Sequence, residues 1–181
     1  LVAVLRDYVK GILEPNPWFD RVIGGDDKSL GGFFELIRKI QRLRPDVALV
    51  LPSLMRSALI ARLGGSRKVI GDRRDGRNLL LNGGPRPERD GKKIKPVPMV
   101  HYYLKLARWL KLPPPQHIRP QLFMSEPQRQ KADELLSHWG ISGDDQVVGL
   151  NPGARFGSSK CWPAENFARL AELLVRRWSC K

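Results

Sequence analysis

One passage near the carboxyl end, residues 146–178, restricts the possible fold of this chain more than any other part of the sequence. Its first residues, QVVGL at 146–150, form a short apolar run that is typical of a buried parallel strand. Pro163 stands where a helix can begin, because the first helical position does not use its backbone N–H. Apolar residues then recur at helical spacing: Phe167, Leu170, Ala171, Leu174 and Trp178. The passage therefore predicts a strand, a loop and a helix, as in α/β folds.

The loop between this strand and this helix carries the groups of an anion site. Gly153 can adopt dihedral angles that are closed to other residues, which leaves backbone N–H groups uncovered. The candidate ligands are Gly153, Ala154, Arg155, Ser158, Ser159 and Lys160. Unpaired N–H groups and the helix dipole both favour a phosphate at a helix N-terminus. A turn with a solvated Lys160 is the alternative, because the loop matches neither the P-loop nor the dinucleotide-binding motif.

The first part of the chain shows the same alternation of strand and helix. Residues 1–5 and 47–51 are apolar runs, residues 8–13 favour a short helix or turn, and residues 18–23 favour an extended segment. Ser29 can cap a helix in which apolar residues follow the i, i+3, i+4, i+7 rule: Phe33, Leu36, Ile37, Ile40 and Leu43. Strands and helices joined by short links predict a parallel sheet that is covered on both faces.

A second polar loop follows the apolar run at 47–51. Ser53, Arg56 and Ser57 lie where this loop enters the next helix, which is expected to end near Leu63. Ligands of open α/β sheets bind beyond the carboxyl ends of the strands, so these three residues stand where a site is expected. The alternative is that Ser53 only caps the helix and that Arg56 is solvated.

The chain is strongly basic, with 32 Lys and Arg against 18 Asp and Glu and a net charge of +14. Half of this net charge lies in residues 62–95, whose Gly, Pro and charge content favours irregular loops. Such a segment is either solvated or a phosphate-binding lip, and it points to nucleic acid, an acidic membrane surface or phosphorylated substrates. A nucleic-acid-binding module is the less favoured alternative, because aromatic residues are not interleaved with the basic ones.

The remaining sequence separates two parts of the chain. Residues 100–111 have helical period, with one apolar face made of Val100, Tyr103, Leu104, Ala107 and Leu110, and His101 and Tyr102 are expected to be packing or surface residues rather than catalysts. A stiff Pro113-Pro114-Pro115 stretch then leads to about Phe123. Ser125 and Gln128 form a capping box for a further helix that Gly140 ends. Neither the two cysteines nor the three histidines have metal-ligand spacing, so no metal is expected, and no apolar run is long enough to span a membrane.

Three strings resemble segments of the ADP-heptose:lipopolysaccharide heptosyltransferases, which form glycosyltransferase family 9. Residues 151–174, NPGARFGSSKCWPAENFARLAELL, resemble the family pattern PGAxFGxxKxWPxxxFAxLA. Residues 51–71, LPSLMRSALIARLGGSRKVIG, resemble LPNSxxSALxxxxxGIPxRxG. Residues 71–82, GDRRDGRNLLLN, resemble GxRxxxRxxLLN. The PGAxFG string at 152–157 is more like that of the members that add the second heptose.

The resemblance implies an α/β fold of the GT-B type. Residues 1–123 would be an incomplete Rossmann-like domain on the acceptor side, and residues 124–181 would begin a Rossmann-like domain that binds the nucleotide sugar. Such enzymes transfer heptose from ADP-heptose to the lipopolysaccharide inner core with inversion, and other members use other acceptors. The loop that ends at Lys160 would hold the donor diphosphate. The acceptor-binding candidates are Ser53, Arg56, Ser57, Arg73 and Arg77.

The resemblance also implies what lies outside these residues. The family's general base is an Asp in the first βα turn, which would precede Leu1, and a segment that completes the nucleotide pocket would follow Lys181. We therefore assign no catalytic residue and expect a fragment without transferase activity; turnover of ADP-heptose by the 181 residues would contradict this. A cytoplasmic location is expected, with peripheral contact to the anionic inner membrane, without a cofactor or a tightly bound metal.

Overall fold

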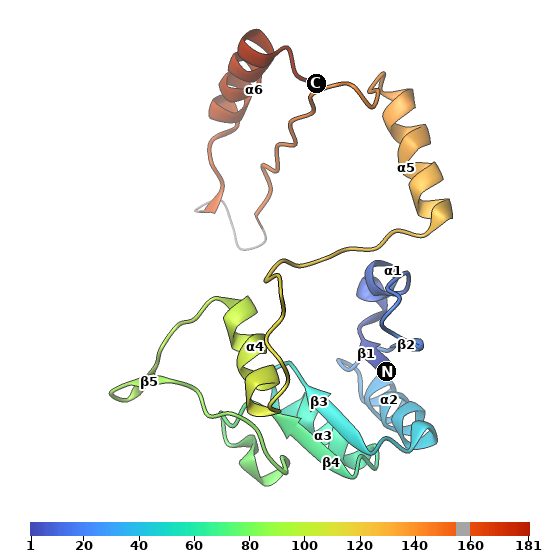
Figure 1. The fold of residues 1–181 in the computed structure, drawn as a ribbon, viewed down its shortest axis with the longest axis vertical. Coiled ribbons are helices and arrows are strands. Elements are labelled where there is room, and N and C mark those ends of the chain that lie inside the picture. Colours follow the sequence, from blue (N-terminus) through green and yellow to red (C-terminus); the bar gives the residue numbers. More distant parts are fainter. Residues whose placement is uncertain (155–159) are drawn as a thin grey trace. The chain divides into compact units, whose positions relative to one another are not determined.

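The computed structural model describes residues 1–154 and 160–181. The chain divides into two units, Leu1–Phe123 and Met124–Lys181. Figure 1 shows the strands in the first unit, together with the helices α1 to α4, whereas the second unit contains α5 and α6. The predicted α/β class is therefore confirmed for the first unit, and the two units are described separately.

The strands of the first unit form two parallel pairs. β1 (Val2–Leu5) pairs with β2 (Arg21–Gly24), and β3 (Val47–Val50) pairs with β4 (Lys68–Gly71). Among the described residues no ladder joins the two pairs, so the single sheet expected from the alternation does not form. The chain crosses between paired strands through η1 (Asp7–Val9) and α1 (Lys10–Leu13) in the first pair, and through α3 (Met55–Leu63) in the second.

The expectation that both faces of the strands are covered is wrong for β1 and β3, whereas Val69 and Ile70, on opposite faces of β4, are both buried. Val50 is buried, but Val47 and Leu49 of the same strand are each nearly half exposed. Val2 and Val4 of β1 are likewise exposed, whereas Ala3 and Leu5 are partly covered. Because successive side chains point to opposite faces of a strand, this alternation means that one face packs and the other meets solvent.

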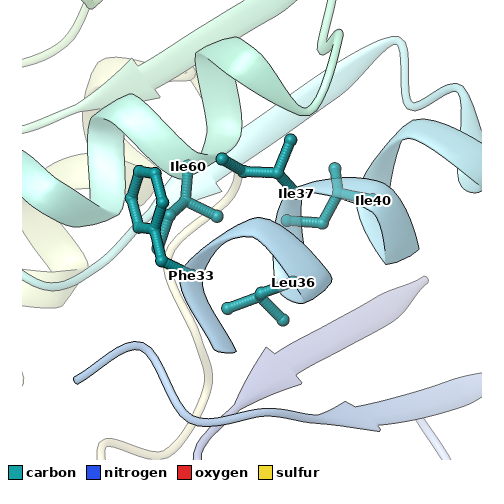
Figure 2. Close-up of a cluster of buried hydrophobic side chains, with 5 residues drawn as sticks. All are labelled: Phe33, Leu36, Ile37, Ile40 and Ile60. Carbon is teal, nitrogen blue, oxygen red and sulfur yellow. The ribbon is translucent and has the colours of Figure 1, made fainter. Parts of the chain in front are cut away.

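The core lies between two helices, as predicted for the first of them. Ser29 caps α2 (Leu30–Leu43), accepting a hydrogen bond from the backbone N–H of Gly32 at 3.1 Å. Arg44, with a left-handed φ of 46°, follows its end. The buried cluster in Figure 2 combines one face of α2 with a residue of α3: Phe33, Leu36, Ile37, Ile40 and Ile60. A smaller cluster of Val50, Ala61 and Val69 lies at the β3–β4 pair.

Two adjacent glycines at the start of α2 provide a test of this packing. A Cβ on Gly31 would meet nothing within 4 Å, whereas a Cβ on Gly32 would lie 2.0 Å from the backbone oxygen of Asp26. We expect Gly31→Ala to raise the free energy of unfolding by about 0.5–1 kcal/mol, because alanine loses less backbone entropy in a helix. Gly32→Ala should lower it. Equal effects of both changes in urea unfolding would contradict the close approach at Gly32.

The basic segment after β4 is more ordered than its composition predicts. It contains the 3-10 turn η2 (Arg77–Leu79) and the short antiparallel pair β5 (Arg89–Asp90) and β6 (Lys93–Ile94). Residues 82–85 return along β4: Asn82 N–H donates to the oxygen of Val69 at 2.8 Å, and Gly71 N–H donates to the oxygen of Gly83 at 3.1 Å. Residues 82–85 therefore lie alongside β4 and bond to its backbone, without forming a regular strand.

The last helix of the first unit differs from its predicted packing. α4 spans Met99–Trp109, close to the expected range. Its buried residue is Leu106, whereas Val100 and Tyr103, which were placed on the apolar face, are exposed by 38% and 41%. Tyr102 is partly covered, as are Leu104, Ala107 and Leu110 of the predicted face, so that face is confirmed in part.

The second unit has two helices with little packing of their own. α5 (Glu126–His138) begins at the predicted capping box, in which the N–H of Ser125 donates to Gln128 Oε1 at 2.9 Å. Gly140, with a φ of 66°, lies just beyond its end. α6 (Ala164–Trp178) follows Pro163, and neither helix has a buried residue. No helix among the described residues is long and apolar enough to cross a membrane.

The strand predicted at 146–150 does not form as a regular element. Its backbone nevertheless has partners in the manner of a parallel ladder: Lys181 N–H donates to the oxygen of Gln146, and Val148 N–H donates to the oxygen of Lys181, both at 2.9 Å. The Lys181 ammonium lies 2.8 Å from Asp145 Oδ2. Its hydrogen bond, with those from Ser142, lowers the pKa of Asp145 to about 2. The segment is thus held at one point rather than along a strand.

Candidate functional site

Ser53 lies just beyond the end of β3, at the carboxyl edge where a ligand was predicted. Its Oγ is 3.3 Å from the hydroxyl of Tyr102 on α4, and both side chains are partly buried. The alternative interpretation of Ser53 as a helix cap is wrong, because α3 begins after Leu54 and has no side-chain cap. Tyr102 was expected to be a packing or surface residue, since helical periodicity alone gives no sign of a partner 49 residues away.

Arg56, on the first turn of α3, contacts residues of α2 and its cap. One guanidinium nitrogen donates to the backbone oxygen of Ser29 at 3.2 Å, and the guanidinium carbon lies 4.7 Å from the centre of the Phe33 ring. Its Nε is buried and makes no hydrogen bond to another described residue. Arg56 is therefore partly buried, whereas the alternative interpretation had it fully solvated. Ser57 is partly buried on the same helix.

The three arginines in the turn directly after β4, at 73, 74 and 77, have different surroundings. Arg73 is partly exposed, and its backbone N–H donates to the oxygen of Pro85 at 2.8 Å. Arg74 is also partly exposed and pairs with Asp75 at 2.8 Å, a hydrogen bond that raises the pKa of the Arg74 guanidinium. Arg77 is completely buried. The repeated arginines in the sequence gave no signal to distinguish the buried one.

Arg77 was predicted to contact the acceptor, and its guanidinium lies inside the first unit instead of at the surface. Its Nε donates to the backbone oxygen of Asp72 at 2.7 Å, and Nη1 donates to the backbone oxygen of Pro52. With no exposed surface in this structure, the side chain is not available to a ligand. Direct contact between Arg77 and an acceptor therefore stays a prediction that this conformation does not support.

The predicted diphosphate loop lies only partly within the described residues. Arg155, Ser158 and Ser159 are outside them. Gly153 and Ala154 are exposed, and Gly153 does not have the positive φ that the sequence suggested. Lys160 is exposed and lies three residues before Pro163, the N-cap of α6. Among the residues predicted to bind the donor diphosphate, Lys160 is thus described and lies just before the N-terminus of a helix, where an anion is favoured.

Other surface features lie away from these residues. Two open hollows, of about 520 and 420 Å³, share Arg42 near the carboxyl-terminal end of α2. Arginines dominate the larger one, where they complement the helix dipole. Across the described residues, no three His, Cys, Asp or Glu side chains are grouped as metal ligands. The polar residues beyond β3 and β4 remain the candidate site of the first unit.

Comparison with solved structures supports this placement of the strands and helices. The chain superposes with a TM-score of 0.82 on a glycosyltransferase family 9 protein from Veillonella parvula, at 21% identity, over 97% of this chain and 50% of that one. The TM-score is 0.69 on the ADP-heptose LPS heptosyltransferase II of E. coli, at 25% identity, over 97% of this chain and 52% of that one.

Comparison with curated sequences gives the same family. Lipooligosaccharide heptosyltransferase 2 of Haemophilus influenzae is 32% identical over 154 residues, which are 80% of this chain and 43% of that protein. Lipopolysaccharide heptosyltransferase 2 of Salmonella typhimurium is 30% identical over 179 residues, 96% of this chain and 49% of that protein. The chain thus spans about half the length of the curated relatives it matches.

A family model also matches most of the chain. The model described as glycosyltransferase family 9 (heptosyltransferase) matches residues 33–179, from the core face of α2 to the end of α6. The match includes the polar residues beyond β3 and β4 as well as the loop before α6. The resemblance found in three short strings therefore extends over most of the sequence, and the chain belongs to glycosyltransferase family 9, the heptosyltransferase family.

Proposed function

We propose that this chain is part of a transferase that moves L-glycero-D-manno-heptose from ADP-heptose to the inner core of lipopolysaccharide. The observation that carries the proposal is the family match over residues 33–179, because it includes both polar loops at once. The similar proteins are named heptosyltransferases, and one solved structure is an ADP-heptose transferase. Transfer would invert the anomeric centre, in the two-domain GT-B arrangement of the family.

On the donor side, the loop before α6 would bind the diphosphate. Charge builds up on the departing diphosphate during transfer, and a cation held in place stabilises it without further reorganisation. Lys160 is the candidate for that cation, because it is exposed and precedes a helix of 15 residues. Backbone N–H groups at Gly153 and Ala154, with Arg155, Ser158 and Ser159, would complete the contacts.

On the acceptor side, the residues beyond β3 and β4 would bind a phosphorylated lipid A-core sugar. Ser53 offers a hydroxyl beside that of Tyr102, and Arg73 and Arg74 offer partly exposed cations. Arg56 and Ser57 lie on the helix that follows. The basic segment 62–95 would also be attracted to anionic lipid at the cytoplasmic face of the inner membrane, where the acceptor lipid would be met.

The acceptor side is tested by removing its exposed charge. We expect the double change Arg73→Gln and Arg74→Gln to weaken binding of a phosphorylated inner-core oligosaccharide by about two- to thirtyfold, because each of the two exposed ion pairs contributes about 0.2–1 kcal/mol. The effect should shrink as salt is raised. Isothermal titration at two salt concentrations measures both quantities.

The matched control is Arg67→Gln. Arg67 is an exposed arginine just before β4, at the opposite end of that strand, and it pairs with Asp46 at 3.1 Å. Its replacement removes a charge from the same unit without touching the predicted site. Equal weakening by the control would mean that net charge alone drives binding, and this result would count against the acceptor site.

A further inference from the structure

The completely buried guanidinium of Arg77 connects the exits of two neighbouring strands. Pro52 lies two residues after the end of β3, and Asp72 follows the last residue of β4. Arg77 donates from Nη1 to the oxygen of Pro52 and from Nε to the oxygen of Asp72, the latter at 2.7 Å. Figure 1 shows β3 and β4 side by side, so the two carbonyl groups belong to one edge of this pair. One side chain thus holds both loops at that edge.

The chemistry of this contact requires arginine. Its planar guanidinium carries five N–H donors in fixed directions, so it can reach two carbonyl groups from different strands at once. The ammonium group of a lysine is a compact charge at the end of a flexible chain and has no such fork. Gly76, with a φ of 76°, precedes Arg77 and provides the left-handed backbone that turns the chain into η2.

Global stability alone is a poor explanation for this arrangement. Nη2 of Arg77 and Oδ2 of Asp72 are both buried, and neither makes a hydrogen bond to another described residue. A buried charged or polar atom without a partner is costly, and an apolar side chain at this position would avoid that cost. The cost is understandable if the fixed position of the two loops is what matters.

The two bound carbonyl groups belong to residues directly before the predicted acceptor contacts. Pro52 precedes Ser53, whose hydroxyl lies 3.3 Å from that of Tyr102. Asp72 precedes Arg73 and Arg74. A shift of either carbonyl group would move the next side chain with it, because one peptide bond of fixed geometry separates them.

We propose that Arg77 is a positioning residue: from inside the first unit it holds the loops after β3 and β4 together, so that Ser53, Arg73 and Arg74 lie at one edge. The identity of the ligand at this edge rests on the proposed function. The position of the loops does not, since it follows from the two hydrogen bonds of the buried side chain.

Peptide-resolved hydrogen exchange on the 181-residue chain tests this proposal. In Arg77→Met we expect exchange in residues 51–57 and 72–78 to be at least about tenfold faster, because hydrogen bonds from a buried charged donor are lost. Residues 30–43 of α2 should keep their wild-type rate. Arg77→Lys keeps the positive charge but lacks the planar donor group. Exchange in the two loops should therefore be as fast in this variant as in Arg77→Met. Arg67→Met is the matched control and should leave all three segments unchanged.

Three results would overturn the proposal. Unchanged exchange in both loops would show that Arg77 does not hold them. An equal rise in the loops and in α2 would make Arg77 a residue of general stability. Full recovery of the wild-type pattern by Arg77→Lys would show that charge, rather than the planar donor, holds the loops. Binding of the inner-core oligosaccharide, measured in parallel, should weaken with the loop opening. Failure of the wild-type chain to bind it would contradict the proposed function, while the exchange pattern would still decide the role of Arg77.

Discussion

Replacement of Gly84 by alanine is expected to lower the free energy of unfolding of the first unit by about 3 kcal/mol, through backbone strain and the loss of a hydrogen bond. The φ of Gly84 is 141°, a backbone angle that residues with a side chain rarely adopt. A Cβ there would lie 1.8 Å from the backbone oxygen of Gly71. Gly71 N–H also donates to the oxygen of the preceding residue, Gly83. The added carbon would therefore separate the returning segment from β4. Urea unfolding followed by circular dichroism measures the loss.

Gly91→Ala is the control for this change. Gly91 also has a positive φ, of 58°, but a Cβ there would meet nothing within 4 Å. Its replacement should cost only about 1–2 kcal/mol, the usual penalty of a left-handed conformation. If Gly84→Ala were no more destabilising than this control, the return of residues 82–85 along β4 would be wrong.

Local signals in the sequence predicted the helices well. α2 followed from the spacing of its apolar residues and from Ser29 before it, because both depend on neighbours within one helical turn. The start of α5 followed from Ser125 and Gln128 in the same way. The packing of α4 was predicted less well, because its buried residue, Leu106, was not on the predicted face.

Pairing between distant segments could not be predicted in the same way. The apolar run at 47–51 was assigned to a strand covered on both faces, yet Leu49 is exposed. Exposure depends on which elements pack over a strand, and the run itself does not encode this. The return of residues 82–85 along β4 was also missed, since it uses backbone groups of a Gly-rich and Pro-rich segment that favours loops.

The site shows the same division. The position of Ser53 followed from the rule that sites lie beyond the carboxyl ends of strands. Its partner Tyr102 and the burial of Arg77 depend on how α4 and the basic segment pack, which no local pattern reveals. The donor contacts predicted at Gly153, Ala154 and Lys160 rest on the family pattern and remain predictions.

Loss of the Lys160 ammonium should have the largest effect on ligand binding. We expect Lys160→Ala to weaken binding of ADP-heptose by about ten- to a hundredfold, because a hydrogen bond to a charged group contributes about 1.5–3 kcal/mol. Lys131→Ala is the matched control, since Lys131 is an exposed lysine of α5 in the same unit. It should leave the affinity unchanged. Lys160→Arg should retain part of the affinity, because it keeps the charge but not the shape of the donor.

One titration series tests the central claim, that this chain binds a nucleotide sugar rather than nucleic acid. The affinity of the wild-type chain and of Lys160→Ala is measured for ADP-heptose and for a random single-stranded DNA at physiological salt. The account predicts tighter binding of ADP-heptose by the wild-type chain, and selective loss of that binding in the variant. Tighter, salt-sensitive binding of DNA, with ADP-heptose affinity unaffected by Lys160→Ala, would contradict it.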